Sequence, residues 1–197
     1  MCDAWIGADA GGLVEMKVRR VVTGVDVTGK SVFVSDSEVD PVEIAIMPGT
    51  VFHRVWGSDE HPSLPTDGSQ PSMPDYFPPS AGYRFGFFTL GPDNTRVPED
   101  LDVGKAFEEL RTKLPGLADV MEPGNPGMHT TDTVDIDLVV SGEVDLELDD
   151  GAEVHLRTGD CVIQNGTRHA WRNRSDEPVT IFVTLLGATL SARAEVR

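Results

Sequence analysis

From residue 127 onward, hydrophobic and polar residues alternate in short stretches that are separated by turns. Val144, Leu146 and Leu148 alternate with acidic residues, which predicts a strand with one face in water. Asp149-Asp150-Gly151 is typical of a hairpin turn. The return strand holds Val154 and Leu156, and further strands are expected over 161–164, 169–173 and 179–186. Short strands at this spacing, with no helix between them, indicate a sandwich or a barrel.

The N-terminal half shows more strand-like stretches, at 17–22, 31–34, 42–47, 51–56 and 83–90. Residues 58–82 hold six prolines and many small polar residues, so this stretch is expected to be a long loop over the surface or across a pocket mouth. One helix is predicted, with its apolar face formed by Val103, Phe107, Leu110 and Leu114, and it ends at Pro115-Gly116. The expected fold class is all-β with minor α content, in one or two short helices.

Composition and charge narrow the classes of partner. The 197 residues suit one domain with an extended arm, and 39% hydrophobic residues can form a sizeable core. The net charge of -17 argues against nucleic acid and anionic membranes as partners, since both are polyanions. Cys2 and Cys161 do not make a disulfide framework. No apolar stretch is long enough for a membrane span, so we expect a soluble cytoplasmic protein.

Candidate chemistry lies in the C-terminal half. His129 and Asp135 precede the turn Ser141-Gly142-Glu143, and His169 follows Gly166, with Asn173 four residues later. Alternate residues of each strand face the inside of a small barrel, so side chains from separate strands can point at one spot. Imidazole and carboxylate groups that converge there would make a site for a divalent transition metal.

These residues resemble the two motifs of the cupin superfamily. The family usually has His-x-His, three or four residues, Glu, six residues and Gly. His129 matches the first His and Asp135 takes the Glu position, with six residues between it and Gly142, whereas Thr131 stands where the second His is expected. In the second motif the spacing Gly-x-x-His-x-x-x-Asn is kept from Gly166 to Asn173, and Gln164 replaces the usual Pro.

The resemblance is to small bacterial single-domain cupins with a conserved cupin-2-type barrel, which share no single activity. It implies a double-stranded β-helix (jelly-roll) barrel over 1–197, with an N-terminal strand extension. Residues 1–100 would complete the barrel with strands and the Pro-rich loop, 101–122 would be helical, and 123–190 would hold the core motifs. It also implies a homodimer, for which the stretch 1–60 offers strands.

With Thr131 in place of a His, the expected metal ligands are His129, Asp135 and His169. Two His and one carboxylate with open positions is the pattern associated with Fe(II), which we favour, although zinc, manganese or nickel could occupy the same ligands. Thr131 could hydrogen-bond a metal-bound water, and Asp132 is an alternative to Asp135 as the carboxylate ligand. Asp137 shares the inward face of a regular strand with Asp135 and is a candidate for acid–base catalysis.

Two classes of function follow. The first is a metal-dependent enzyme that acts on a small organic substrate, either as a dioxygenase or by lyase, isomerase or dehydratase chemistry. The alternative is a non-catalytic cupin that binds a small molecule, because a barrel can lose its metal and keep its fold.

Overall fold

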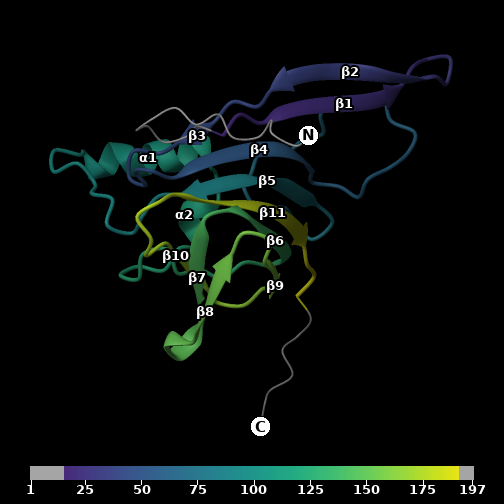
Figure 1. Ribbon diagram of the computed structural model, residues 1–197. Coiled ribbons are helices and arrows are strands. Elements are labelled where there is room, and N and C mark those ends of the chain that lie inside the picture. The colour runs from purple at the N-terminus through teal and green to yellow at the C-terminus, as the bar shows by residue number, and fades with distance from the viewer. Residues whose placement is uncertain (1–15, 191–197) are drawn as a thin grey trace, which may run out of the picture.

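The computed structural model describes residues 16–190, and its strands form three antiparallel sheets (Figure 1). From the sequence we expect residues 1–14 to be a loosely held leader, and they lie outside the described residues. The strands are β1 (Arg19–Val25), β2 (Ser31–Glu38), β3 (Val42–Glu43), β4 (Val51–Ser58), β5 (Tyr83–Leu90), β6 (Thr133–Ser141), β7 (Glu143–Glu147), β8 (Glu153–Arg157), β9 (Cys161–Asn165), β10 (Ala170–Arg172) and β11 (Val179–Gly187). The helical elements are α1 (Val103–Lys113), α2 (Leu117–Val120) and the short turn η1 (Asp149–Gly151). The expectation of an all-β protein with a few short helices is confirmed.

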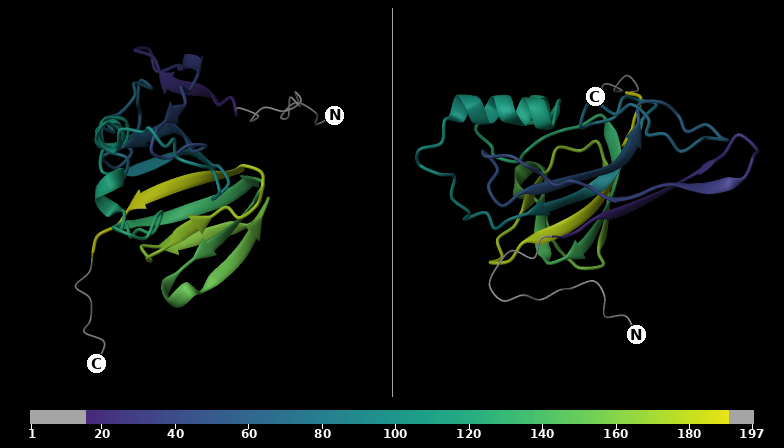
Figure 2. Two further views of the ribbon diagram at one scale, coloured as in Figure 1. Left: turned by 90° about the vertical axis from the view of Figure 1, so that its left-hand side faces the viewer. Right: turned by 90° about the horizontal axis from the view of Figure 1, so that it is seen from above.

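A six-stranded sheet in the order β3-β4-β5-β11-β6-β9 forms one wall of the barrel, and the three-stranded sheet β10-β7-β8 forms the other (Figures 1 and 2). β11 is central, because it pairs along its length with both β5 and β6. The η1 turn joins β7 to β8, where Asp150 adopts a positive φ of 57°. The core between the two walls is aliphatic and consists of Val139, Val144, Leu146, Leu156, Val179 and Ile181.

A second apolar cluster joins the helices to the six-stranded sheet at one end of the barrel. Leu110, Leu114 and Leu117 pack there against Ile44 and Phe52. The predicted apolar face of α1 was partly wrong, because the side chains of Val103 and Phe107 are 54% and 40% exposed and Ala106 is buried instead. No helix within 16–190 is both long and apolar enough to cross a membrane.

The four strands that precede the Pro-rich loop contribute in different ways. β1 and β2 pair only with each other, as a hairpin that projects beyond the body of the barrel (Figure 2), whereas β3 and β4 join the six-stranded sheet. The strand expected over 42–47 is wrong beyond Glu43. The chain turns there, since Met47 N–H donates to the carbonyl of Ile44 and Thr50 N–H to that of Met47.

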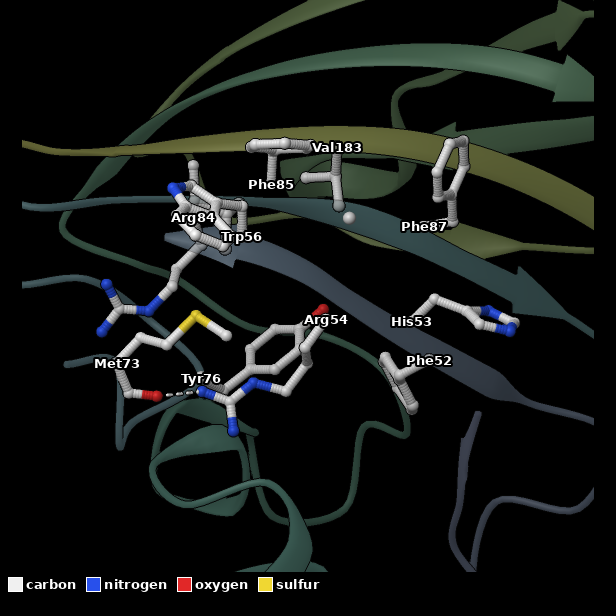
Figure 3. A pocket seen from close by; sticks show the side chains of 12 residues that line it. Phe52, His53, Arg54, Trp56, Met73, Tyr76, Arg84, Phe85, Phe87 and Val183 are labelled. Carbon is white, nitrogen blue, oxygen red and sulfur yellow. Dashed lines mark hydrogen bonds between the residues drawn. The ribbon is translucent and has the colours of Figure 1, made fainter. Parts of the chain in front are cut away.

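Residues 59–82 contain no helix or strand, as their proline content predicts, and two arginines hold this loop against the sheet. Arg54 on β4 donates to the carbonyl oxygens of Met73 (2.6 Å) and Asp75 (2.8 Å). Arg84 on β5 donates to the carbonyl of Asp75 (3.1 Å) and pairs with the carboxylate of Asp59. Figure 3 shows both arginines around a pocket of about 20 Å³. The loop is therefore anchored through its backbone.

Candidate functional site

A cavity of about 110 Å³ opens inside the barrel, between the six-stranded sheet, β10 and the helical end. Most of its wall is apolar and aromatic. Its polar side chains include two imidazoles and two carboxylates, and no lysine or arginine is among the residues that line it. The lining residues used below are Phe52, Tyr76, Phe77, Phe88, His129, Asp135, Asp137, His169 and Trp171.

The two imidazoles come from segments that are distant in the sequence and are joined as an antiparallel bridge. The backbone N–H of His129 donates to the backbone carbonyl of His169 (3.0 Å), and the backbone N–H of His169 donates to the backbone carbonyl of His129 (2.9 Å). Their ring centroids lie 4.3 Å apart. In addition, Nδ1 of His129 lies 2.9 Å from the carbonyl of Gly127, and Nδ1 of His169 lies 2.9 Å from the carbonyl of Thr167. A carbonyl can only accept, so each Nδ1 carries the proton and each Nε2 keeps its lone pair.

The two carboxylates come from β6, where alternation of the strand turns Asp135 and Asp137 to the cavity. Asp135 lies opposite Gln164 on β9, and Asp137 lies opposite Val183 on β11. Both aspartates are buried, and Oδ1 of Asp135 has no hydrogen-bond partner among the described residues. The expected inward direction of Asp137 is therefore seen in the structure.

Burial sets the charge of all four groups. It lowers the pKa of His129, and it lowers the pKa of His169 to about 4 with a further contribution from His129. Burial raises the pKa of Asp135 to about 6, against a hydrogen bond from Thr133 that lowers it. Burial and the charge of Asp135 together raise the pKa of Asp137 to about 8. At neutral pH the imidazoles are therefore uncharged and Asp137 retains its proton.

The other expected site residues lie outside the cavity lining. Thr131 is buried, and its hydroxyl lies 2.8 Å from that of Thr133, so it reaches Asp135 only through that neighbour. Asp132 is exposed. Gln164 is buried beside Asp135, with its Oε1 accepting from Thr167 (2.7 Å) and its Nε2 without a partner in the described chain. The sequence marks this position as unusual, because Gln164 stands where the family usually has proline.

Asn173, the last residue of the second motif, holds a turn of the backbone and does not line the cavity. It is fully buried, its Nδ2 donates to the carbonyls of Leu90 and Glu177, and its Oδ1 accepts from Ser175. It fixes the turn that leads from β10 to β11. The motif therefore contributes one cavity residue, His169, and one turn residue.

The cavity wall combines side chains of the barrel with side chains of the Pro-rich loop. Phe52 and Trp171 line it, and Tyr76 and Phe77 show that the Pro-rich loop forms part of the wall. The ring of Tyr76 meets that of Phe52 edge to face at 5.6 Å. Four aromatic residues of the neighbouring strands are not among the lining residues, namely Trp56, Phe85, Phe87 and Phe182.

The donor set fits a divalent transition metal in its chemistry. The Nε2 lone pairs of His129 and His169 and the unpartnered Oδ1 of Asp135 are the kinds of ligand that such ions bind. As they stand, however, no three His, Cys, Asp or Glu side chains within 16–190 are grouped closely enough to hold an ion. The imidazole pair is the preorganised part of the donor set.

Comparison with known proteins identifies the family of the chain. The family model for the cupin domain matches residues 120–185, which span both motifs. Phomopsin biosynthesis cluster protein C' of Diaporthe leptostromiformis is 36% identical over 129 residues, covering 58% of this chain and 68% of that protein. The cupin-domain-containing oxidoreductase srdB of Neurospora crassa is 45% identical over 60 residues, 30% of this chain and 31% of that protein.

Among solved structures, the cupin domain of Schizosaccharomyces pombe Cnp3 overlaps 85% of each chain, with 8% identity and a TM-score of 0.42. The two facing sheets hold the residues that the family model for the cupin domain matches. By its matched domain and its relatives, the chain belongs to the cupin superfamily.

Proposed function

We propose that this cupin is an enzyme that binds a small, largely apolar organic molecule in the barrel cavity and transfers a proton to it from Asp137. The single observation that carries the proposal is the placement of two buried carboxylates and two neutral imidazoles on one apolar, aromatic cavity. Burying such groups is unfavourable for folding, so their concentration at one cavity favours a catalytic role.

The walls restrict the class of substrate. A cavity of about 110 Å³ is smaller than the roughly 150 Å³ that admits benzene in an engineered protein, so it accepts a short chain or part of a larger molecule. Phe52, Phe88 and Trp171 offer flat apolar contacts. Because no cationic side chain lines the cavity, phosphorylated compounds are disfavoured. The relatives from a named biosynthesis cluster support a role in small-molecule biosynthesis.

Asp137 can move a proton in both directions during an elimination. In its protonated form it gives the proton to a substrate hydroxyl as the carbon–oxygen bond breaks and water leaves. The resulting carboxylate then accepts the proton from the adjacent carbon as the carbon–carbon double bond forms. The residue ends as it began and the net change is loss of water, the chemistry of a dehydratase or lyase.

A divalent metal on His129, His169 and Asp135 belongs to the same proposal, and when bound it would polarise a substrate oxygen as a Lewis acid. The protein keeps both imidazoles neutral and holds each Nδ1 on a carbonyl, so that the lone pair of each Nε2 is left for a metal ion. Thr131 supports Asp135 through Thr133. Fe(II) with a dioxygenase reaction is the second candidate, favoured by the name of the oxidoreductase relative and by the two-His-one-carboxylate set.

Metal content tests the ligand assignment. Protein purified without chelator is expected to hold about one transition metal per chain by elemental analysis, as a three-ligand site binds one ion. His129→Ala and His169→Ala should lose it. His155→Ala is the matched control, since that imidazole is exposed and paired with Asp145 at 2.8 Å. Wild-type protein that is metal-free and takes up none of Fe(II), Zn(II), Mn(II) or Ni(II) would contradict the assignment.

Product and oxygen measurements then separate the two reactions. Candidate hydroxylated and aromatic substrates are incubated with the protein, and loss of water from the substrate is followed by mass spectrometry, alongside oxygen consumption. Loss of water that disappears in Asp137→Asn supports proton transfer by Asp137. Oxygen consumption that survives in Asp137→Asn supports the dioxygenase. Tight binding of such a compound with neither signal would show a non-catalytic binding protein.

A further inference from the structure

The Pro-rich loop places Tyr76 on a wall that two pockets share. The cavity and the smaller pocket of Figure 3 have four lining residues in common, which are Phe52, Tyr76, Val183 and Leu185. Three of these side chains are apolar, so the hydroxyl of Tyr76 is the polar group that the shared wall offers. Val183 lies opposite Asp137 on the neighbouring strand β6, and Leu185 lies opposite Asp135. The shared wall therefore lies beside the two aspartates of the cavity.

The backbone around Tyr76 is held by both the sheet and the helical end of the barrel. The backbone N–H of Tyr76 donates to the carbonyl of Pro115 (2.8 Å), which lies between α1 and α2. The carbonyl of the preceding residue, Asp75, accepts from Arg54 on β4 (2.8 Å) and from Arg84 on β5 (3.1 Å). Figure 3 shows Arg54 beside Tyr76 at the smaller pocket. Because these contacts hold the position of Tyr76, a ligand would meet its side chain without rearrangement of the loop.

The ring of Tyr76 is packed, whereas its hydroxyl is available to a ligand. The ring meets those of Phe52 and Phe77 edge to face, at centroid distances of 5.6 and 4.9 Å. The hydroxyl makes no hydrogen bond to any residue within 16–190, although an enclosed tyrosine hydroxyl usually has a partner. Burial raises the pKa of Tyr76, with a contribution from the charge of Asp135 and against that of Arg54. The phenol therefore keeps its proton at neutral pH and can donate it in a hydrogen bond.

A hydrogen-bond donor on the wall beside Asp137 fits the chemistry of an elimination. When a proton leaves carbon, the electron pair that remains is stabilised if it can spread onto the oxygen of a neighbouring carbonyl. A donor that is already held at this oxygen stabilises the charge as it develops and needs no reorganisation. No lysine or arginine among the residues that line the cavity could act in this way. The hydroxyl of Tyr76 is a neutral donor on a fixed segment, and it meets this requirement.

We propose that the hydroxyl of Tyr76 donates a hydrogen bond to a carbonyl oxygen of the substrate, and that the substrate is a short β-hydroxy carbonyl compound. This inference rests on the proposed elimination by Asp137. Asp137 gives its proton to the β-hydroxyl as the carbon–oxygen bond breaks, and water leaves. It then takes the proton from the carbon next to the carbonyl, and the electron pair of that carbon–hydrogen bond becomes the double bond. Tyr76 keeps its own proton throughout, so the products are an unsaturated carbonyl compound and water, without oxidation or reduction.

A pair of probes with the same shape tests whether Tyr76 binds a carbonyl oxygen. 2-Butanone and 2-methyl-1-butene have an oxygen and a CH₂ group, respectively, at the same position, and the oxygen alone accepts a hydrogen bond. Chelator treatment of the protein removes any metal ion that could hold the ketone, and each titration is followed by the NMR signals of the backbone amides. In Tyr76→Phe the Kd of 2-butanone should rise about 3–10-fold through loss of one hydrogen bond, while the Kd of 2-methyl-1-butene stays unchanged. The variant should melt at the wild-type temperature, because phenylalanine keeps the ring contacts.

Two control variants separate the hydroxyl of Tyr76 from other hydroxyls. Tyr83→Phe removes the same group from the other tyrosine of the chain, which lies on β5 and is not among the residues that line the cavity. Thr50→Val removes another hydroxyl of the cavity lining, outside the shared wall. Neither control should change the Kd of 2-butanone. An unchanged Kd in Tyr76→Phe, or an equal rise in either control, would overturn the inference.

Turnover of a matching substrate tests the substrate class. 4-Hydroxy-2-butanone is the β-hydroxy derivative of the ketone probe, and protein purified without chelator should convert it to but-3-en-2-one and water, which absorbance measures. Tyr76→Phe should lower kcat by about 100-fold and change KM far less, because the hydrogen bond strengthens as charge develops on the oxygen. A wild-type protein that forms no product would overturn the substrate class.

The binding data distinguish failure of this inference from failure of the proposed function. If neither probe binds the wild-type protein, the cavity does not accept small organic molecules of this size, and both proposals are contradicted. If both probes bind and Tyr76→Phe changes neither Kd, only the role of Tyr76 is refuted and the proposed function stands.

Discussion

Replacing Arg84 by Met should destabilise the protein far more than the same replacement at an exposed arginine. The Arg84 side chain is 6% exposed and donates to the carbonyls of Ser58 (2.8 Å), Tyr83 (3.0 Å) and Asp75 (3.1 Å), besides its ion pair with Asp59. Met fills a similar volume but donates no hydrogen bond, so these acceptors lose their partner.

The size of the effect follows from the exposure of those acceptors. A buried acceptor left without a donor costs about 1–3 kcal/mol, and breaking a buried ion pair costs about 3–5 kcal/mol. The Asp59 side chain is 32% exposed, so water solvates it in the variant and the upper values do not apply. We therefore expect Arg84→Met to lower the free energy of unfolding by about 2–4 kcal/mol.

Urea unfolding followed by circular dichroism measures this change, with Arg19→Met as the control. Arg19 pairs with Asp36, but the two side chains are 68% and 49% exposed, so that variant should lose at most about 1 kcal/mol. Limited proteolysis within residues 59–82 should also become faster in Arg84→Met, since the loop loses an anchor. Equal losses in the two variants, or unchanged cleavage of the loop, would refute the reasoning.

Three further predictions concern pH, backbone packing and the turn at Asn173. The pKa of Asp137 rises from 3.8 to about 8 on folding, so this carboxyl contributes stability that is complete below its unfolded pKa and lost as the pH rises through about 8. In chelator-treated protein its contribution to the unfolding free energy should fall by up to about 1.4 kcal/mol per pH unit across this window, and Asp137→Asn should remove that slope in urea titrations. Gly187→Ala should lower the free energy of unfolding by at least about 3 kcal/mol, because its Cβ would lie 1.7 Å from the Pro79 carbonyl oxygen. Gly104→Ala in α1 should instead raise the free energy of unfolding by about 0.5–1 kcal/mol. Thermal melts with the opposite order would contradict both expectations. Asn173→Ala should lower the unfolding free energy by about 2–3 kcal/mol without loss of bound metal, and loss of metal at unchanged stability would instead make Asn173 part of the site.

β6 shows what sequence patterns could and could not predict here. Alternation identified the strand, but hydropathy alone would turn Ile136 and Leu138 inward and both aspartates to water. The resemblance of the motif, with Asp135 in the family's carboxylate position, gave the inward direction that the structure has. The local pattern predicts which residues share a face of the strand. Which of the two faces lies toward the cavity depends on how the sheets assemble.

The details that sequence reasoning missed depend on contacts between distant segments. The buried side of α1 is set by its packing on Ile44 and Phe52, so Ala106 lies inside and Val103 outside. Likewise, nothing in the sequence near Thr131 indicates that its hydroxyl would bond to Thr133 and stay out of the cavity lining. Such contacts require the tertiary arrangement.

The backbone bridge between His129 and His169 separates the two tasks of the cavity. Two main-chain hydrogen bonds hold the segments that carry the imidazoles side by side, and neither bond involves a side chain. The aromatic wall, by contrast, is supplied largely by side chains of other elements, among them Tyr76 and Phe77 of an anchored loop. Substitutions in that wall can therefore change which molecule is accepted while the histidine pair keeps its geometry. This independence would let related proteins diverge in substrate without rebuilding the reactive centre.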